Sequence, residues 1–327
     1  MAELLARAEI SPSTITDLLE RYLKDNILRP ATLRTYRKVI ACLIKDCGKG
    51  ADTLPLGEIT FDLLTEWRRM VLERASPATW NNYRTHLRAL LNYAILWGWI
   101  ETNPLIYVKS APTAQRRKRT VPEKNLRTIL ALLNDDYGDD GGTDTGSLYP
   151  RWFWRIVLRT FYYSGMRLRQ LVSLRWRDID FARNEILLTA EGSKTRREWT
   201  IPLSTLLRDD LRLLMNRTMR TSGITAQAAL LDRQVFNVTL FYKRYKGAEM
   251  TEAHVHGFFR RLSGATGIAI SAHRMRHTVA TELMRGRNPD VKAVQQLLGH
   301  TDIRTTLSYV ETDTEQLRHI VGNLTAL

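Results

Sequence analysis

Side chains that suit the chemistry of phosphate esters lie in three separate segments of this 327-residue chain. They are Arg167 in a Ser-Gly-Met-Arg sequence, the His-x-x-Arg pair His273 and Arg276, His300 after a glycine, and Tyr309. Two guanidinium groups can hold the non-bridging oxygens of a phosphodiester through paired, charge-assisted hydrogen bonds. A tyrosine hydroxyl, with an ordinary pKa of about 10, becomes a nucleophile when a base helps to remove its proton. The set therefore suits phosphoryl transfer in which fixed cations take the place of a magnesium ion.

Helical spacing decides how these side chains can meet. His273 and Arg276 lie three positions apart on an expected helix, so both project from one face. His277 is turned by about 100° from Arg276, and we expect it to have a structural role.

The third segment contains the signals of a helix followed by a reversal of the chain. Asn288-Pro289 can begin this helix and Gly299 can end it, because proline suits the first turn and glycine the left-handed cap. His300 then lies at the reversal, from which its side chain can project into a cleft. A short helix after Thr301 is expected to place Tyr309 near its end.

Taken together, the three segments resemble the tyrosine recombinases, the family of phage integrases and Xer-type resolvases. The segments are YYSGMRLRQLVSLRWRDID at 162–180, SAHRMRHTVATELM at 271–284 and QQLLGHTDIRTTLSYVE at 295–311. The resemblance covers residues 121–327, and the amino-terminal half resembles the core-binding domain of that family. It requires an arginine, a His-x-x-Arg, a Gly-His and a tyrosine in fixed order, which makes the match specific.

The resemblance implies a set of catalytic residues by position: Arg167, Lys194, His273, Arg276, His300 and the nucleophile Tyr309. Lys194 matches the lysine of a β-hairpin, and Arg196 or Arg197 lies close enough to be an alternative. One position departs from the family pattern, because Gln170 stands where many members have glutamate. This departure concerns the hydrogen bonds behind the site.

In this interpretation Tyr309 attacks a DNA phosphate and forms a 3′-phosphotyrosine linkage, with a free 5′-hydroxyl as the other product. Lys194 supplies the proton that the leaving 5′-oxygen needs, His273 moves protons around the phosphate, and His300 supports the site through a hydrogen bond. The positioned cations take the place of a metal ion, and we expect no cofactor. ATP is not required, because the phosphoester bond is conserved. His254 and His256 form a His-x-His without a convincing third ligand, so we assign them to a surface loop or a phosphate contact.

The first hundred residues predict four helices. They begin near Ser11-Pro12, at about residue 32, at Thr60 and at Ser76-Pro77, and the second extends to residue 47. The second and fourth combine an apolar back with a polar, basic front, which suits DNA contact as well as a solvated surface. The expected DNA-binding residues on these fronts are Arg34, Arg37, Lys38, Asn81, Arg84 and Arg88.

Composition shifts divide the chain into a four-helix domain at 1–108, a basic linker at 109–120 and a catalytic domain at 121–327. The linker contains the run Arg116, Arg117, Lys118 and Arg119, which we expect to lie on phosphates. Within the catalytic domain, strands are expected at 178–181, 185–189 and 198–202, and an aromatic helix at 152–163. The acidic, glycine-rich stretch 134–147 reads as a mobile insertion. The fold class is mainly α with a small antiparallel β-sheet: an all-α core-binding domain plus a tyrosine-recombinase catalytic domain.

The charge of the chain points to a polyanionic partner. Lys and Arg number 49 against 34 Asp and Glu, a formal charge of +15, with +7 before residue 121 and +8 after it. Both halves are therefore expected to face one DNA duplex, although solubility alone is the alternative explanation. Two cysteines do not make a disulfide framework or a four-ligand zinc site. No apolar run has the roughly 18 residues of a membrane span, so we expect a cytoplasmic, nucleoid-associated protein without a membrane partner.

The expected partners are double-stranded DNA with specific recombination sites and further copies of the chain. Residues 312–327 predict a final helix with a small apolar face, which packs on its own domain or on a neighbouring protomer of a tetramer. The resemblance favours the second arrangement. Three other functions are weighed against integration or excision by recombination: DNA binding without catalysis, nicking and closing like a type IB topoisomerase, and a metal-dependent nuclease.

Overall fold

The structure is a computed structural model that describes residues 11–48, 52–114, 119–134, 146–190, 197–285 and 289–309. The chain forms two compact units, Met1–Arg116 and Arg117–Leu327. Each unit has a hydrophobic core of its own. No helix among the described residues is long and apolar enough to cross a bilayer.

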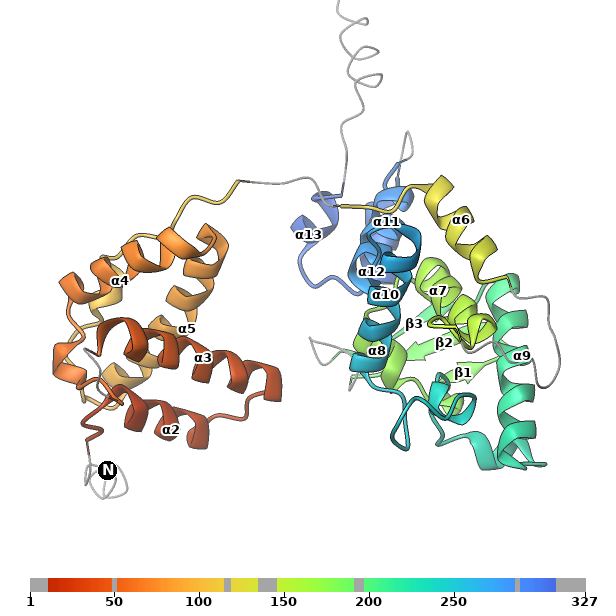
Figure 1. Ribbon diagram of the computed structural model, residues 1–327, viewed down its shortest axis with the longest axis horizontal. Helices are drawn as coiled ribbons and strands as arrows, with labels where there is room; N and C mark the ends of the chain where they lie inside the picture. Colours follow the sequence, from red (N-terminus) through yellow and green to blue (C-terminus); the bar gives the residue numbers. More distant parts are fainter. Residues whose placement is uncertain are drawn as a thin grey trace, which may run out of the picture. The chain divides into compact units, whose positions relative to one another are not determined.

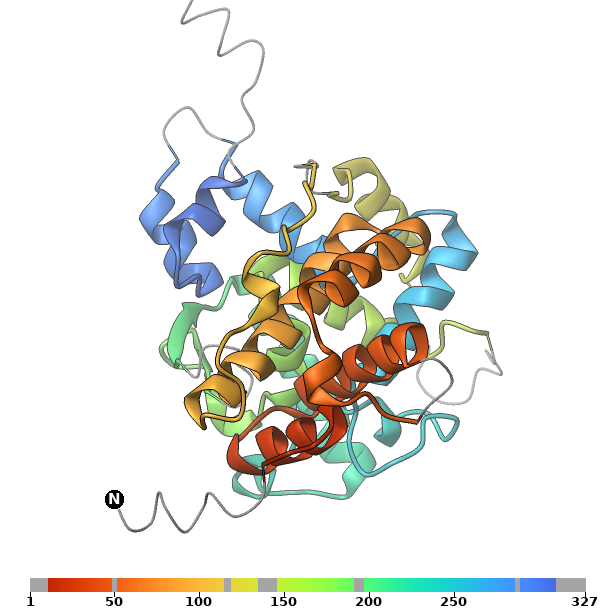
Figure 2. The ribbon, with the colours of Figure 1, turned by 90° about the vertical axis from the view of Figure 1, so that its left-hand side faces the viewer.

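Within its described residues, the amino-terminal unit contains four α-helices, as the sequence predicts (Figures 1 and 2). They are α2 (Ile15–Asp25), α3 (Pro30–Cys47), α4 (Phe61–Arg74) and α5 (Pro77–Leu96), with short 3-10 turns η2 (Leu56–Glu58) and η3 (Pro104–Ile106). The hydroxyls of Thr60 and Ser76 cap α4 and α5 by accepting backbone N–H groups. Helix α2 begins later than predicted, at Ile15, because its N-cap Thr14 forms a reciprocal capping box with Asp17.

The core of this unit is built from the apolar faces that the sequence pattern predicts. Trp80, Leu87 and Leu91 of α5 are buried, and the ring of Trp80 meets that of Trp67 from α4 edge to face at 5.4 Å. α3 contacts the other three helices. The polar fronts of α3 and α5 are therefore left to face outward or toward the segment that follows.

That segment, residues 105–111, lies along α5 and is held there by side chains. Asn81 donates from Nδ2 to the carbonyl of Ala111, and its Oδ1 accepts the N–H of Ala111, both at 2.8 Å. The Nε of Arg84 donates to the carbonyl of Val108 at 2.7 Å. The path of the chain as it leaves the helical unit is thus fixed by polar residues of α5.

The carboxy-terminal unit is mainly helical with one small sheet (Figure 1). Its helices are α6 (Glu123–Leu132), α7 (Arg151–Ser164), α8 (Leu168–Ser173), α9 (Thr205–Ser222), α10 (Glu252–Thr266), α11 (Ala272–Leu283), α12 (Val291–Leu298) and α13 (Ile303–Leu307), with 3-10 turns η4 (Trp176–Asp178), η5 (Gln227–Leu230) and η6 (Val238–Leu240). The strands β1 (Ile179–Asp180), β2 (Glu185–Leu188) and β3 (Trp199–Pro202) form an antiparallel sheet in the order β1-β2-β3. All three predicted strands are confirmed, each slightly shorter than expected.

Helix α7 forms the centre of this unit, packed between α9 and α11. Most of its side chains are buried, and the ring of Trp154 stacks on Phe258 of α10 at 4.2 Å. The aromatic helix that the sequence predicts is therefore the central element on which the others pack. Its carboxyl end leads directly to Arg167.

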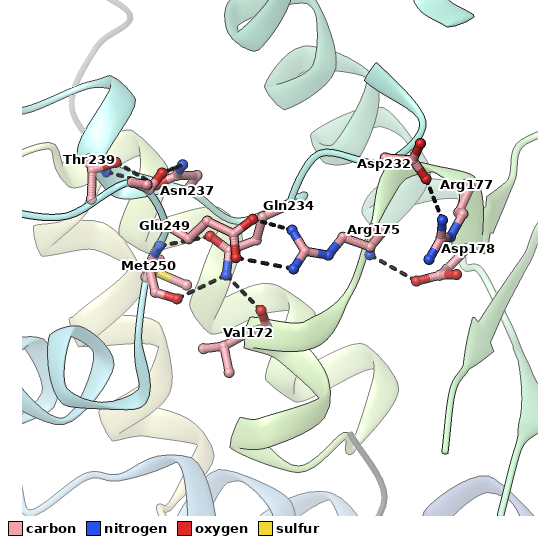
Figure 3. Close-up of polar contacts among 11 residues, drawn as sticks. Val172, Arg175, Arg177, Asp178, Asp232, Gln234, Asn237, Thr239, Glu249 and Met250 are labelled. Atoms are coloured by element: carbon pink, nitrogen blue, oxygen red, sulfur yellow. Dashed lines mark hydrogen bonds and ion pairs between the residues drawn. The ribbon is translucent and has the colours of Figure 1, made fainter. Parts of the chain in front are cut away.

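A buried amide holds the end of α8 in place (Figure 3). The Nε2 of Gln234 donates to the carbonyls of Val172 and Met250 at 2.6 and 2.8 Å, and its Oε1 accepts the N–H of Met250 at 2.7 Å. Ion pairs of Arg175 with Glu249 and of Arg177 with Asp232 lie beside it. This network fixes the helix that begins at Arg167.

Several sequence predictions concern residues outside the described ranges, and the prediction for two histidines is corrected. Most of the acidic stretch 134–147, and all of the tail 312–327, lie outside the described residues. His254 and His256, assigned from the sequence to a surface loop or a phosphate contact, do not lie in a loop. They lie on α10, where Nδ1 of His254 accepts the N–H of Thr251 at the start of the helix. The start of α10 was not predicted from the sequence because its capping box is formed by Thr251 and His254.

Two glycine turns with positive φ face the same region of the carboxy-terminal unit. Gly165 ends α7 with φ 61° and Gly299 ends α12 with φ 60°. A Cβ on Gly165 would lie 2.8 Å from Leu298, and one on Gly299 would lie well under 3.0 Å from the indole of Trp199 in β3. Trp199 also donates from Nε1 to the carbonyl of Leu297 at 3.2 Å. Only glycine therefore permits this close packing of the turn on the sheet.

We predict that Gly299→Ala lowers the free energy of unfolding by about 2–5 kcal/mol, because it adds overpacking to the strain of a left-handed backbone. Gly223→Ala is the matched control, since Gly223 ends α9 with φ 64° and a Cβ there meets nothing within 4 Å. It should cost only about 1–2 kcal/mol. Urea unfolding of both variants checks this, and equal losses would contradict the proposed role of Trp199.

Candidate active site

Arg167 lies between the two glycine turns. It is the residue before α8, and its backbone N–H donates to Oε1 of Gln170 at 2.7 Å. Its Nη2 donates to the carbonyl of Gly299 at 3.3 Å, while Nη1 is buried and has no hydrogen-bond partner among the described residues. Burial lowers the pKa of Arg167, and the nearby Tyr309 opposes this shift. One guanidinium edge is thus held by the protein, and a buried donor remains available.

Gln170 shows what the departure from the family pattern does. Its side chain is only 2% exposed, and Oε1 performs the capping role that a glutamate oxygen would have. Its Nε2 is buried without a partner within the described part of the chain. The substitution keeps the cap on Arg167 and leaves one amide donor unsatisfied.

Arg276 is buried at the centre of the site, with 5% of its surface exposed. Its Nη1 donates to the carbonyl of Gly165 at 2.7 Å and its Nη2 to the carbonyl of Leu298 at 2.6 Å. These carbonyls belong to the carboxyl ends of α7 and α12, where backbone acceptors lack helical partners and a positive charge is favourable. Burial, together with the charge of Arg167, lowers the pKa of Arg276 to about 9, while Tyr309 acts in the opposite direction. The guanidinium is still charged at neutral pH.

His300 follows the Gly299 turn, as predicted. Its backbone N–H donates to Gln295, whose side-chain Nε2 donates back to the carbonyl of His300. Its Nδ1 lies 2.9 Å from Oγ1 of Thr306 on α13. The imidazole is half-buried and its ring is parallel to that of Tyr309 at 6.0 Å. His300 therefore links the reversal after α12 to the short helix that leads to the tyrosine.

Tyr309 lies two residues beyond α13, close to the predicted position, and only 4% of it is exposed. Its ring packs with a small apolar cluster from α11 and α12 that includes Ala280, Met284 and Leu298. Burial raises the pKa of Tyr309, and the charges of Arg276 and Arg167 partly oppose this. The structure thus brings together the two arginines and the tyrosine from three distant segments.

His277 is a member of this site that the sequence interpretation missed. Its Nδ1 is 2.7 Å from the hydroxyl oxygen of Tyr309. The ring of His273 lies next to it at 4.0 Å, and His273 itself is exposed at the surface. The expectation of a purely structural role considered the angle to Arg276 alone. The signal that was available is the four-residue spacing from His273, which makes the two histidines neighbours on one helical face.

The predicted lysine lies outside the described residues, in the connection 191–196 between β2 and β3. A groove of about 740 Å³ runs between β3 and α12. Arg197, Trp199, Lys292 and His300 are among its lining residues. Arg197, the first described residue after this connection, therefore lines the same groove as His300.

The predicted DNA-binding residues fall into three groups. Arg34, Lys38, Arg88 and Arg119 are exposed, and so is Arg37, which forms an ion pair with Glu20 at 3.6 Å. Asn81 and Arg84 are instead engaged with the main chain of residues 105–111, a role that the helical pattern did not predict. Arg116, Arg117 and Lys118 lie outside the described residues.

The described ranges contain no group of three or more His, Cys, Asp or Glu side chains that could hold a metal ion. The charged groups at the site are guanidinium groups, which can bind phosphate oxygens in a fork geometry.

Comparison with known proteins identifies the family. The model of the phage integrase family matches residues 119–316, and that of the phage integrase SAM-like domain matches residues 14–110. A protein of Pseudomonas syringae that is provisionally named tyrosine recombinase XerC is 33% identical over 318 residues, which are 96% of this chain. The chain spans 64% of the length of that relative. It belongs to the phage integrase family, the tyrosine recombinases.

Solved structures show the same fold. The Tn1549 transposon integrase in complex with transposon right end DNA has a TM-score of 0.71 at 18% identity, covering 96% of this chain and all of that one. The lambda integrase tetramer bound to a Holliday junction has a TM-score of 0.62 at 21% identity, covering 92% of this chain and 80% of that one. The mainly α class with a small antiparallel sheet is therefore confirmed.

The contacts of the two arginines predict different effects on stability. Arg276→Ala leaves two buried carbonyls without their donor, so the free energy of unfolding should fall by about 2–6 kcal/mol. Arg167→Ala removes one long hydrogen bond and a buried donor that has no partner in the described ranges, so its effect should stay below about 1 kcal/mol. Urea unfolding followed by circular dichroism measures both. Equal losses would show that the hydrogen bonds of Arg276 do not hold the two turns together.

Proposed function

We propose that this protein carries out site-specific DNA recombination by cleaving and rejoining strands through a covalent 3′-phosphotyrosine intermediate. The observation that carries the proposal is the meeting of Arg167, Arg276 and a buried Tyr309 from three distant segments, with the carbonyl groups of two helix ends holding the arginines in place. Membership of the tyrosine recombinase family supports the same chemistry.

The arginines bind the phosphate to be attacked. A guanidinium has five N–H donors, and the hydrogen bonds of Arg276 to Gly165 and Leu298 use two of them. The buried Nη1 of Arg167 supplies a further donor. Negative charge that develops on the non-bridging oxygens is stabilised by donors that are already oriented, so little reorganisation is needed at the moment of reaction.

Tyr309 is the nucleophile in this proposal. Its oxygen forms a bond to phosphorus while the bond from phosphorus to the 5′-oxygen breaks. The leaving oxygen is an alkoxide whose parent alcohol is about as weakly acidic as water, with a pKa of roughly 15.7, so it needs a proton. Lys194 supplies it, with Arg196 and Arg197 as alternatives. Arg197 lines the groove that His300 also lines, and three residues span at most about 11 Å, which keeps Lys194 within reach.

The two other predicted residues support the phosphate. His273 is exposed beside His277 and moves protons at the phosphate, and His300 contributes a hydrogen bond from the turn that receives both arginines. One phosphoester replaces another, so a 5′-hydroxyl of a second DNA end can reverse the step without ATP.

The amino-terminal unit holds the DNA in this proposal. Exposed basic residues of α3 and α5 contact phosphates, and the run 116–119 follows the duplex between the units. The solved relatives are described as bound to transposon end DNA and, as a tetramer, to a Holliday junction. By analogy, the chain acts on double-stranded DNA with specific sites, as a tetramer in which residues 312–327 pack on a neighbouring copy. The reaction takes place in the cytoplasm, at the nucleoid, and integrates or excises a mobile element.

Tyr309→Phe removes the nucleophilic oxygen, so this variant should form no covalent adduct with a nicked suicide duplex on a denaturing gel. Its affinity for intact DNA should not change. Tyr163→Phe, on α7, is the control and should keep the wild-type yield. A normal adduct from Tyr309→Phe would refute the assignment. Relaxation of a supercoiled plasmid that lacks any specific site would assign topoisomerase-like activity instead.

Arg88→Ala should weaken DNA binding to a similar extent for all sequences and reduce the slope of log affinity against log salt by about one, as expected for a lost phosphate contact. Arg69→Ala makes the same change in net charge, but Arg69 is paired with Glu66 and Glu73 on α4. It should leave the salt dependence unchanged. Filter binding at several salt concentrations measures both, and identical slopes would exclude a specific contact by Arg88.

A further inference from the structure

The hydroxyl of Tyr309 is held by a histidine outside the predicted catalytic set. Nδ1 of His277 lies 2.7 Å from the hydroxyl oxygen, which is hydrogen-bond distance. The two rings are 5.4 Å apart and inclined by 45°. His277 is half-buried on α11, one residue after Arg276, so the helix that presents the phosphate-binding guanidinium also presents this imidazole.

The chemical setting of Tyr309 creates a need for a base. The phenol is almost fully buried, and burial raises its pKa above the ordinary value. It is therefore protonated at neutral pH and is a poor nucleophile in that form. A general base must lie within hydrogen-bond reach of the proton that it removes, and the nitrogen of His277 meets this condition.

His273 occupies a different position in the site. It is exposed, and its ring lies 4.0 Å from the ring of His277. The four-residue spacing places both histidines on the same face of α11. His273 is thus placed next to His277 and toward the surface. Within the proposed function, His277 serves the phenol and His273 serves the phosphate.

We propose that His277 is the general base that takes the proton of Tyr309 during strand cleavage. The inference rests on the proposed function and adds a residue to it. With the ring proton on Nε2, Nδ1 accepts the hydroxyl proton as the tyrosine oxygen bonds to phosphorus. The bond from phosphorus to the 5′-oxygen breaks at the same time, and Lys194 protonates that oxygen. In the rejoining step the 5′-hydroxyl attacks phosphorus, its proton returns to Lys194, and His277 returns its proton to the departing phenolate.

The decisive variant is His277→Asn. The Asn side-chain oxygen can accept a hydrogen bond near the position of Nδ1, but it cannot keep the proton. A residue that only positions the hydroxyl should therefore tolerate this change, whereas a base should not. His86→Asn is the matched control, because His86 is a half-buried histidine on α5 whose Nδ1 lies 2.9 Å from the carbonyl oxygen of Asn82. Single-turnover cleavage of a nicked suicide duplex by the full chain measures the rate, and gel-shift titration verifies that each variant binds DNA.

We expect His277→Asn to slow cleavage by about 10²–10⁴-fold, the range of a lost general base, while His86→Asn keeps the wild-type rate. A 5′-bridging phosphorothiolate substrate separates the base from the acid. Its thiol leaving group has a pKa near 8.5 and needs no proton donor. It should restore cleavage to Lys194→Ala and leave His277→Asn slow.

Replacing Tyr309 by 3,5-difluorotyrosine provides the complementary measurement. This phenol is more acidic and ionises with little help, so it should restore much of the cleavage rate in the His277→Asn protein. Rescue would also show that the variant is correctly folded around its site.

Three results would overturn the inference: a near wild-type rate for His277→Asn, rescue of His277→Asn by the phosphorothiolate, or failure of difluorotyrosine to restore its rate. The first result would mean that His277 is dispensable or only positions the hydroxyl group. The second would mean that His277 is the proton donor, and the third that its replacement disturbs the structure of the site. The proposed function fails separately, if the wild-type protein itself forms no adduct.

Discussion

The site depends on one buried guanidinium. Arg276 donates to the carbonyl ends of α7 and α12 at once, and so joins two helices that end 134 residues apart in glycine turns at Gly165 and Gly299. Burying a charge is expensive unless it is hydrogen-bonded, and helix carboxyl ends offer the acceptors that reduce this cost. Arg167 adds a second guanidinium at the same turn. The contacts that stabilise the fold here also create the cationic site, so stability and phosphate binding share the same residues.

Much of this arrangement follows from local sequence signals. Thr60 and Ser76 cap their helices as expected, Gly299 ends α12, and the three strands lie where alternation and turn residues place them. These features depend on contacts between near neighbours, which the sequence contains directly. The order of the arginines, histidines and tyrosine identified the family chemistry, because so many reactive residue types rarely recur in that order by chance.

The partners of individual polar side chains were not predictable in the same way. Asn81 and Arg84 lie on the polar front of α5, but the fold turns residues 105–111 back over that front. Periodicity gives the direction of a side chain and not what covers it. The contact of His277 was not predictable for the same reason, since its partner is Tyr309, 32 residues later in the chain. These missed contacts join distant segments of the chain.

The central claim is that Tyr309 becomes esterified to the DNA backbone beside the two turn-bound arginines. Mass spectrometry of the trapped adduct, after nuclease and trypsin digestion, tests this most directly. The account predicts a nucleotide joined through a 3′-phosphate to Tyr309 in the tryptic peptide 305–318. A nucleotide on any other residue, or a linkage through a 5′-phosphate, would contradict it.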